Sequence, residues 1–80
     1  MFPDTVLIKT VRGREEIKTR AHDLSAMQRR LLILVDGVRS VAEISDLLGR
    51  SKSDPIVMRD LKVLERERYV DRADEVESVA

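Results

Sequence analysis

The chain is 80 residues long, which is enough for one small domain with a single core but not for a deep substrate cavity. Apolar residues make up 42% of it and charged residues 38%, a composition typical of globular rather than disordered proteins. The 15 basic side chains are balanced by 15 acidic ones, which excludes a uniformly cationic nucleic-acid coat, and the lack of cysteine excludes disulfides, thiolate metal sites and cysteine nucleophiles.

The hydrophobic pattern does not predict a membrane or secretion segment. The longest unbroken apolar run covers residues 31–35, far fewer than the roughly 18 residues of a spanning helix. No positively charged stretch followed by an apolar one opens the chain. We therefore expect a cytoplasmic protein.

The neutral total charge hides an uneven distribution. Residues 73–80 carry three acids and no base, so this segment has a charge of −3 and the other 72 residues sum to +3. An acidic tail after a basic segment can mask a basic face, or it can simply be a solvated terminus.

Capping residues predict a central helix that begins after Ser25. Ser25 and Gln28 fit a capping box, and Gly37 supplies a left-handed stop. Between them, one helical face carries Met27, Leu31, Leu34 and Val35. Leu32 and Ile33 extend the apolar surface, so we expect this helix to pack on several sides.

Two further helices follow the same pattern. Ser40 and Glu43 form a second capping box, and Gly49 ends that helix. Its predicted buried stripe consists of Val41, Ile44, Leu47 and Leu48. A third helix is expected to begin with Asp54 as N-cap and Pro55 at its first position, and to run to about residue 67.

The remaining segments predict short strands and one more helix. Residues 5–8 are β-prone and can form a strand or an arm, and residues 13–21 are helix-like with Ile17 as their main apolar anchor. Residues 69–70 are predicted to form a short strand that pairs with residues 76–79 in a hairpin.

Three helices followed by a small hairpin is the order of a winged helix-turn-helix. Segment 41–49 resembles the second helix of that family, in which an Ala-Glu-Ile core precedes a glycine, and segment 58–70 resembles its recognition helix and the start of its wing. The matching positions in the latter are Arg59, Leu61, Leu64, Glu65, Tyr69 and Val70. The resemblance implies a mainly α fold with a small β-hairpin, in which a three-helix core is joined to an N-terminal helix or arm, and a bacterial-type regulatory DNA-binding function.

We expect three parts: a strand or helix arm at 1–24, the winged-helix core at 25–72, and an acidic wing strand or tail at 73–80. Two features depart from the family. Arg68 stands where a glycine is usual, and residues 50–54 lengthen the turn between the second and third helices by about two residues. The stretch 36–44 is also similar to small PqqD-like winged helices, which bind leader peptides instead of DNA.

The third helix carries the candidate DNA contacts. At about 100° per residue, Val57, Leu61 and Leu64 define its core direction, and Arg59, Lys62 and Arg66 fall on the opposite side without an acid among them. Such a stripe suits contacts with phosphate or guanine, and it is also compatible with an ordinary solvated face. Further contacts are expected from Arg50, Lys52 and Arg72.

The alternative function is a protein- or peptide-binding adaptor without DNA binding. Its candidate contact residues are the apolar side chains on the flanks of the third helix and in the N-terminal strand: Ile56, Met58, Val63 and Leu7. Ordinary packing explains the same residues, and edge pairing of the 5–8 strand offers a route to a homodimer.

Catalysis is not indicated. His22 is the only histidine, so a capping or exposed role outweighs that of a ligand or base, and no cysteine is present to complete a transition-metal set. The three glycines are too far apart to form a phosphate-cradling loop. We expect no metal, no cofactor and no enzymatic activity.

The predicted core yields a stability test. It consists of Leu31, Leu34, Ile44, Leu47, Leu61 and Leu64. Leu61→Ala should lower the free energy of unfolding by about 2–5 kcal/mol, because a cavity replaces a buried side chain. Chemical denaturation measures this loss, and a value below about 1 kcal/mol would show that the third helix does not pack as predicted.

Overall fold

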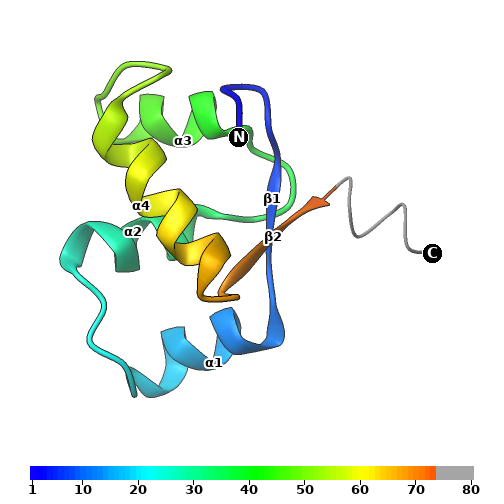
Figure 1. Ribbon diagram of the computed structural model, residues 1–80, viewed down its shortest axis with the longest axis vertical. Helices are drawn as coiled ribbons and strands as arrows, with labels where there is room; N and C mark the ends of the chain where they lie inside the picture. Colours follow the sequence, from blue (N-terminus) through cyan, green and yellow to red (C-terminus); the bar gives the residue numbers. More distant parts are fainter. Residues whose placement is uncertain (74–80) are drawn as a thin grey trace.

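The computed structural model describes residues 1–73. This part of the chain forms four helices and a two-stranded antiparallel sheet (Figure 1), which confirms the mainly helical class with a small β element. In chain order the elements are β1 (Leu7–Lys9), α1 (Val11–Thr19), α2 (Ala26–Leu34), α3 (Val41–Leu47), α4 (Pro55–Arg66) and β2 (Val70–Arg72).

Helices α2, α3 and α4 begin where their capping residues predict, whereas α1 begins at Val11, two residues before the predicted start. Ser25 and Gln28 form the complete capping box of α2, and Ser40 and Glu43 form that of α3, with each side chain bound to the other residue's backbone N–H. Asp54 accepts hydrogen bonds from the first N–H groups of α4 at 2.9 and 3.2 Å. These bonds satisfy backbone donors that a helix leaves unpaired at its start.

The N-terminal segment forms a strand, one of the two forms expected for it, and this strand completes the chain's own sheet. β1 pairs with β2, so that Leu7 lies opposite Arg72 and Lys9 opposite Val70. On its other side β1 accepts a hydrogen bond of 2.9 Å from the Gly37 backbone, and Val6 forms a bridge with Ser40. The predicted partner strand at 76–79 lies outside the described residues.

One cluster of buried side chains joins all the elements except α1, whose Ile17 packs against it. Leu31, Ile44, Leu61 and Leu64 are buried in it as predicted, and Leu34 packs against its edge. The prediction that Leu47 is buried is wrong, because this residue is 56% exposed. The buried side of α3 runs through Val41, Ile44, Ser45 and Leu48, and Leu47 points roughly 100° away from that direction.

Helix α1 is built into the domain rather than forming an arm. It begins after Thr10, and its buried residues are Gly13 and Glu16, while the predicted anchor Ile17 is only partly buried. A Cβ atom at Gly13 would lie 2.1 Å from the Tyr69 carbonyl oxygen, so the backbones of α1 and the α4–β2 turn are in direct contact. The segment expected as an arm at 1–24 is therefore continuous with the core.

The turn after α4 keeps the left-handed backbone that a glycine would adopt. Arg68 has a φ of 68°, its N–H binds the Glu65 carbonyl at 3.0 Å, and the Tyr69 N–H binds the Leu64 carbonyl at 2.9 Å. This is the Schellman pattern of helix termination, in which glycine is the usual left-handed residue. Arg68 thus adopts the left-handed conformation that this turn requires although it is not a glycine.

A buried carboxylate links α1 to α2. Glu16 is 2% exposed, and its carboxylate binds the His22 Nδ1 at 2.7 Å and accepts a hydrogen bond from Arg29 Nη2 at 3.2 Å. Burial raises the pKa of this carboxyl, but the hydrogen bonds from His22 and Arg29 outweigh it, and the net result is a pKa below the ordinary value. His22 thus anchors the loop between α1 and α2.

The contact of Gly13 with Tyr69 can be tested by adding one methyl group. Gly13→Ala should lower the free energy of unfolding by about 1–3 kcal/mol through overpacking, although alanine favours an isolated helix by up to about 1 kcal/mol. Chemical denaturation measures the change. The control Glu15→Ala alters an exposed residue of the same helix and should stay within about 0.5 kcal/mol of the parent. A Gly13→Ala variant as stable as the parent would contradict the close approach.

The Glu16 carboxylate predicts a pH dependence of stability. Because its pKa is lower in the folded state, the unfolded state takes up the proton first as the pH falls, and the stabilisation is lost through that window. The stability difference between the parent and Glu16→Gln should therefore be largest above about pH 5 and shrink as the pH falls through the lowered pKa. Urea denaturation at a series of pH values measures it, with the exposed Glu15→Gln as control. A difference that does not depend on pH would rule out an ionised Glu16 as the link.

Candidate nucleic-acid interface

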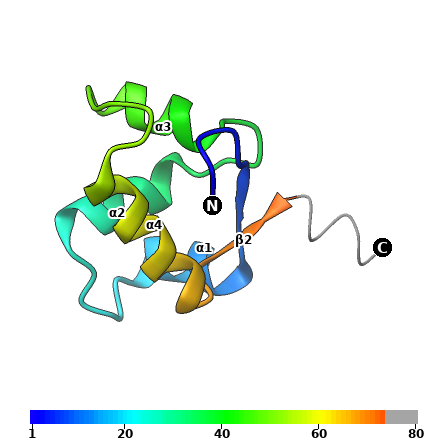
Figure 2. The same ribbon diagram turned by 45° about the horizontal axis from the view of Figure 1, so that its top comes forward.

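Helix α4 exposes the predicted basic stripe. Arg59, Lys62 and Arg66 are all exposed, whereas Val57, Leu61 and Leu64 on the opposite side are fully buried. The exposed side of α4 is therefore set by the packing of its apolar side, as the helical spacing predicts. The helix runs diagonally between α3 at one end of the molecule and α1 at the other (Figure 1, Figure 2).

The charges of this stripe are weakly compensated. The Arg59 side chain is 67% exposed and meets the neighbouring Asp60 carboxylate only at 3.4 Å. Lys62 and Arg66 make no ion pair and no side-chain hydrogen bond with any residue from 1 to 73. Asp60 itself is turned inward, where Gln28 of α2 donates a hydrogen bond of 3.5 Å to it. Positive charge therefore dominates the solvent-facing side of α4.

The three further contacts expected from the sequence, Arg50, Lys52 and Arg72, differ in how far their charges are neutralised. Lys52 is exposed in the α3–α4 turn. Arg50 forms an ion pair of 3.3 Å with Asp54, and Arg72 donates a hydrogen bond of 2.9 Å to Glu65. Both arginines are therefore partly neutralised by residues at the two ends of α4, and Lys52 is the stronger candidate for a backbone phosphate contact.

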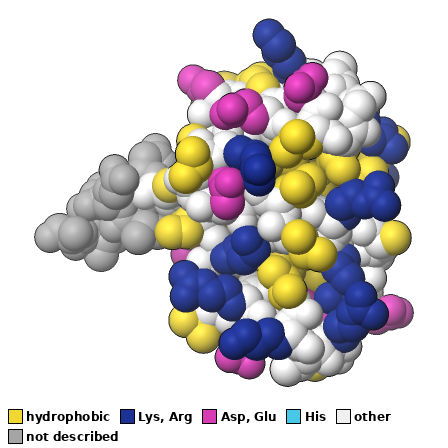
Figure 3. Space-filling view, turned by 180° about the vertical axis from the view of Figure 1, so that it is seen from behind, with side chains coloured by type: hydrophobic (Ala, Val, Ile, Leu, Met, Phe, Trp, Pro, Cys, Tyr) yellow, Lys and Arg dark blue, Asp and Glu magenta, His cyan; other side chains and the backbone are white. Residues whose placement is uncertain are grey.

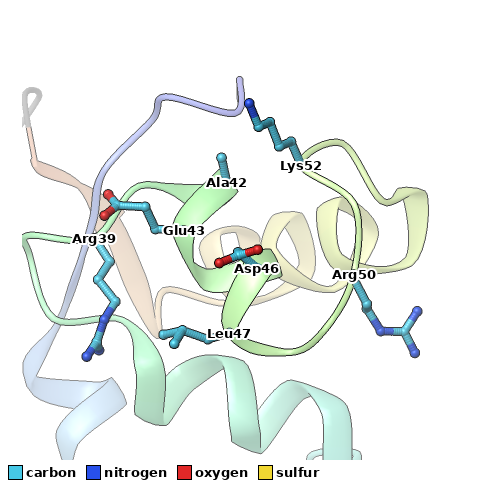
Figure 4. A pocket seen from close by; sticks show the side chains of 7 residues that line it. All are labelled: Arg39, Ala42, Glu43, Asp46, Leu47, Arg50 and Lys52. Atoms are coloured by element: carbon cyan, nitrogen blue, oxygen red, sulfur yellow. The ribbon is translucent and has the colours of Figure 1, made fainter.

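A hollow of about 560 Å³ lies between α3 and the α3–α4 turn (Figure 4). Figure 4 shows Glu43 and Asp46 on α3 and Lys52 on the α3–α4 turn beside Ala42, while the Arg50 side chain points away from α3. The hollow is therefore of mixed charge, and phosphate groups would meet carboxylates in it. The interface is better placed on α4 itself.

Two further arginines, neither of which the sequence indicates as a DNA contact, extend the basic surface at the end of α4. Arg12 of α1 donates a hydrogen bond of 3.0 Å to the Glu67 carbonyl, and its guanidinium lies 4.6 Å from the centre of the Tyr69 ring. Arg68 is exposed in the adjacent turn. Arg12 is 55 residues from Glu67 in the chain, so no local pattern could have placed it there.

The residues of the alternative protein-binding surface do not form one patch. Leu7 is 1% exposed and belongs to the core, so its side chain does not face a partner, contrary to the expectation. Met58 packs against the core, while Ile56 is exposed and Val63 is half-buried on the other flank of α4.

Residues 1–73 contain neither a membrane-spanning helix nor a metal-binding cluster. No helix there is both long and apolar enough to cross a membrane. No cluster of three histidine or acidic side chains in that range could hold a metal ion. Comparison with protein-family models, curated proteins and solved structures gives no match.

Proposed function

We propose that this protein binds double-stranded DNA through α4, in the manner of a small regulatory winged-helix domain. In this assignment α3 and α4 form the helix-turn-helix, α4 is the recognition helix, and β2 is the strand that leads into the wing. The order of the elements, the Schellman turn after α4 and the pairing of β2 with a preceding strand support it.

The observation that carries the proposal is the stripe of Arg59, Lys62 and Arg66. Its three cations are exposed on one side of a helix whose other side is fixed in the core. Of the two acids within α4, Asp60 is buried and Glu65 accepts a hydrogen bond from Arg72. A rigid helix with this arrangement can lie along a groove and place cations against phosphates and base edges. Phosphate contacts of this kind supply affinity, whereas specificity requires base contacts.

The proposal predicts steeply salt-dependent binding. Fluorescence anisotropy with a mixed-sequence duplex should show binding at low salt, and three phosphate contacts give a slope of roughly −3 for the logarithm of affinity against the logarithm of salt. The variant Arg59→Glu/Lys62→Glu should lose detectable binding, because two attractive contacts become repulsive, while its melting temperature should stay nearly unchanged.

The matched control reverses two charges elsewhere. Arg14→Glu/Lys18→Glu makes the same change in net charge on the exposed side of α1, and it should alter duplex affinity no more than a few-fold. Equal losses in both variants would show that net charge, and not α4, governs binding. No binding to duplex at low salt, even after the acids at 74, 75 and 77 are replaced by their amides, would reject the DNA-binding function.

A further inference from the structure

Two adjoining hollows lie outside the proposed DNA interface, along α1 and β1. The first measures about 350 Å³ and is lined by Lys9, Arg14, Ile17 and Lys18. The second measures about 180 Å³ and is lined by Ile8, Lys9, Arg14, Val35 and Asp36. Since both are lined by Lys9 and Arg14, we treat them as one surface and name it the α1–β1 hollow.

The charge of the α1–β1 hollow is positive. Arg14 and Lys18 are one helical turn apart on α1, are exposed, and form no ion pair with any residue from 1 to 73. Lys9 reaches across to the Val35 carbonyl, to which its Nζ donates a hydrogen bond. The one acid in the lining, Asp36, already accepts hydrogen bonds from the Val38 and Arg39 backbones at 2.9 and 2.8 Å and pairs with the Arg39 guanidinium at 3.2 Å.

The floor of the same hollow is apolar. Ile17 and Ile8 are half-buried, and Ile17 packs against the core. Two apolar residues are exposed close in sequence to Val35 and Asp36 of the lining. Ile33 near the end of α2 is 53% exposed, and Val38 in the following turn is 78% exposed. Figure 3 shows the molecule from the side opposite to that of Figure 1, where hydrophobic groups lie among lysine and arginine side chains and, in the upper part, acidic ones. Within the hollow itself, Ile17 lies among Lys9, Arg14 and Lys18, an apolar contact with a charged rim that suits a binding surface.

We propose that the α1–β1 hollow binds a short acidic segment of a partner protein, with one apolar side chain of that segment over Ile17 and its flanking carboxylates beside Lys9, Arg14 and Lys18. Charge complementarity selects this occupant. A DNA duplex offers anionic charge but no apolar side chain for the floor, and a second copy joined by a two-fold axis would place the three cations against themselves.

The test uses the full chain and a defined probe. A ten-residue peptide in which two leucines are flanked by glutamates is titrated into the ¹⁵N-labelled protein, and amide shifts are followed by NMR. Saturable shifts confined to residues 8–18 and 33–38, weakened by salt, are the expected result. A peptide with glycine in place of leucine and one with lysine in place of glutamate should each bind at least ten-fold more weakly.

Two double variants and one conservative variant test whether the peptide binds at this surface. Arg14→Glu/Lys18→Glu should weaken the peptide at least ten-fold, whereas the conservative Lys18→Arg should retain it. Arg59→Glu/Lys62→Glu on α4 should leave peptide affinity within about three-fold of the parent, because it lies outside the hollow. Because each double variant is the control for the other, the experiments distinguish a failure of the DNA-binding proposal from a failure of the peptide-binding proposal.

Three results would overturn the assignment. Duplex DNA that shifts the same amides more strongly than the peptide would make the hollow a nucleic-acid site. Shifts there that grow with protein concentration alone would make it a contact between copies. A gain of ten-fold or more in peptide affinity, when Asp74, Glu75 and Glu77 are replaced by their amides, would identify the chain's own acidic segment as the occupant.

Discussion

The close approach of Gly13 to the Tyr69 carbonyl lets α1 pack against the turn between α4 and β2. No other residue would allow α1 to lie so close to the turn after α4, because any Cβ would overlap the carbonyl oxygen. Thr10, immediately before α1, uses its hydroxyl to bind the Arg68 carbonyl at 2.6 Å and its N–H to bind the Tyr69 carbonyl at 3.1 Å. The sheet register follows from this contact, since Lys9 and Val70 are the residues next to Thr10 and Tyr69.

The packing of α4, together with the turn that meets Gly13, determines what α4 can present to solvent. The helix is fixed along its length by the packing of Leu61 and Leu64 in the core, and at its end by the Schellman turn through Arg68. A helix held in this way cannot rotate to bury its cations, so the stripe on its free side is a rigid feature. The contact between α1 and this turn brings Arg12 to the C-terminal end of α4, where a cation is stabilised by the unpaired carbonyls and by the face of the Tyr69 ring.

Local signals predicted the helices well, and long-range contacts explain what the sequence missed. Caps such as Ser40 and Asp54 act within three residues, so spacing along the chain reveals them. Leu47 matched the apolar pattern of α3, yet a seven-residue helix buries only one narrow side, and nothing in the pattern says which. The burial of Glu16 has no local signal in the sequence, because its partner Arg29 is thirteen residues away and beyond the reach of any helical spacing. The basic stripe of α4 was predictable for the opposite reason, since it depends on one helix alone.

The neutral composition of the chain is compatible with two basic surfaces because of where its acids are used. All 15 bases lie within residues 1–73, together with 12 of the 15 acids. Several of those acids serve the fold: Glu16 binds an arginine and a histidine, Asp36 and Asp54 bind backbone N–H groups, and Asp60 is buried. Exposed charges more than about 10 Å apart are largely screened from each other. An acid that serves the fold on one side of the molecule therefore offsets little of the positive charge on a distant basic surface. Net charge is therefore a poor guide to the partners of so small a domain, and the separate placement of acids and bases decides which surfaces attract an anion.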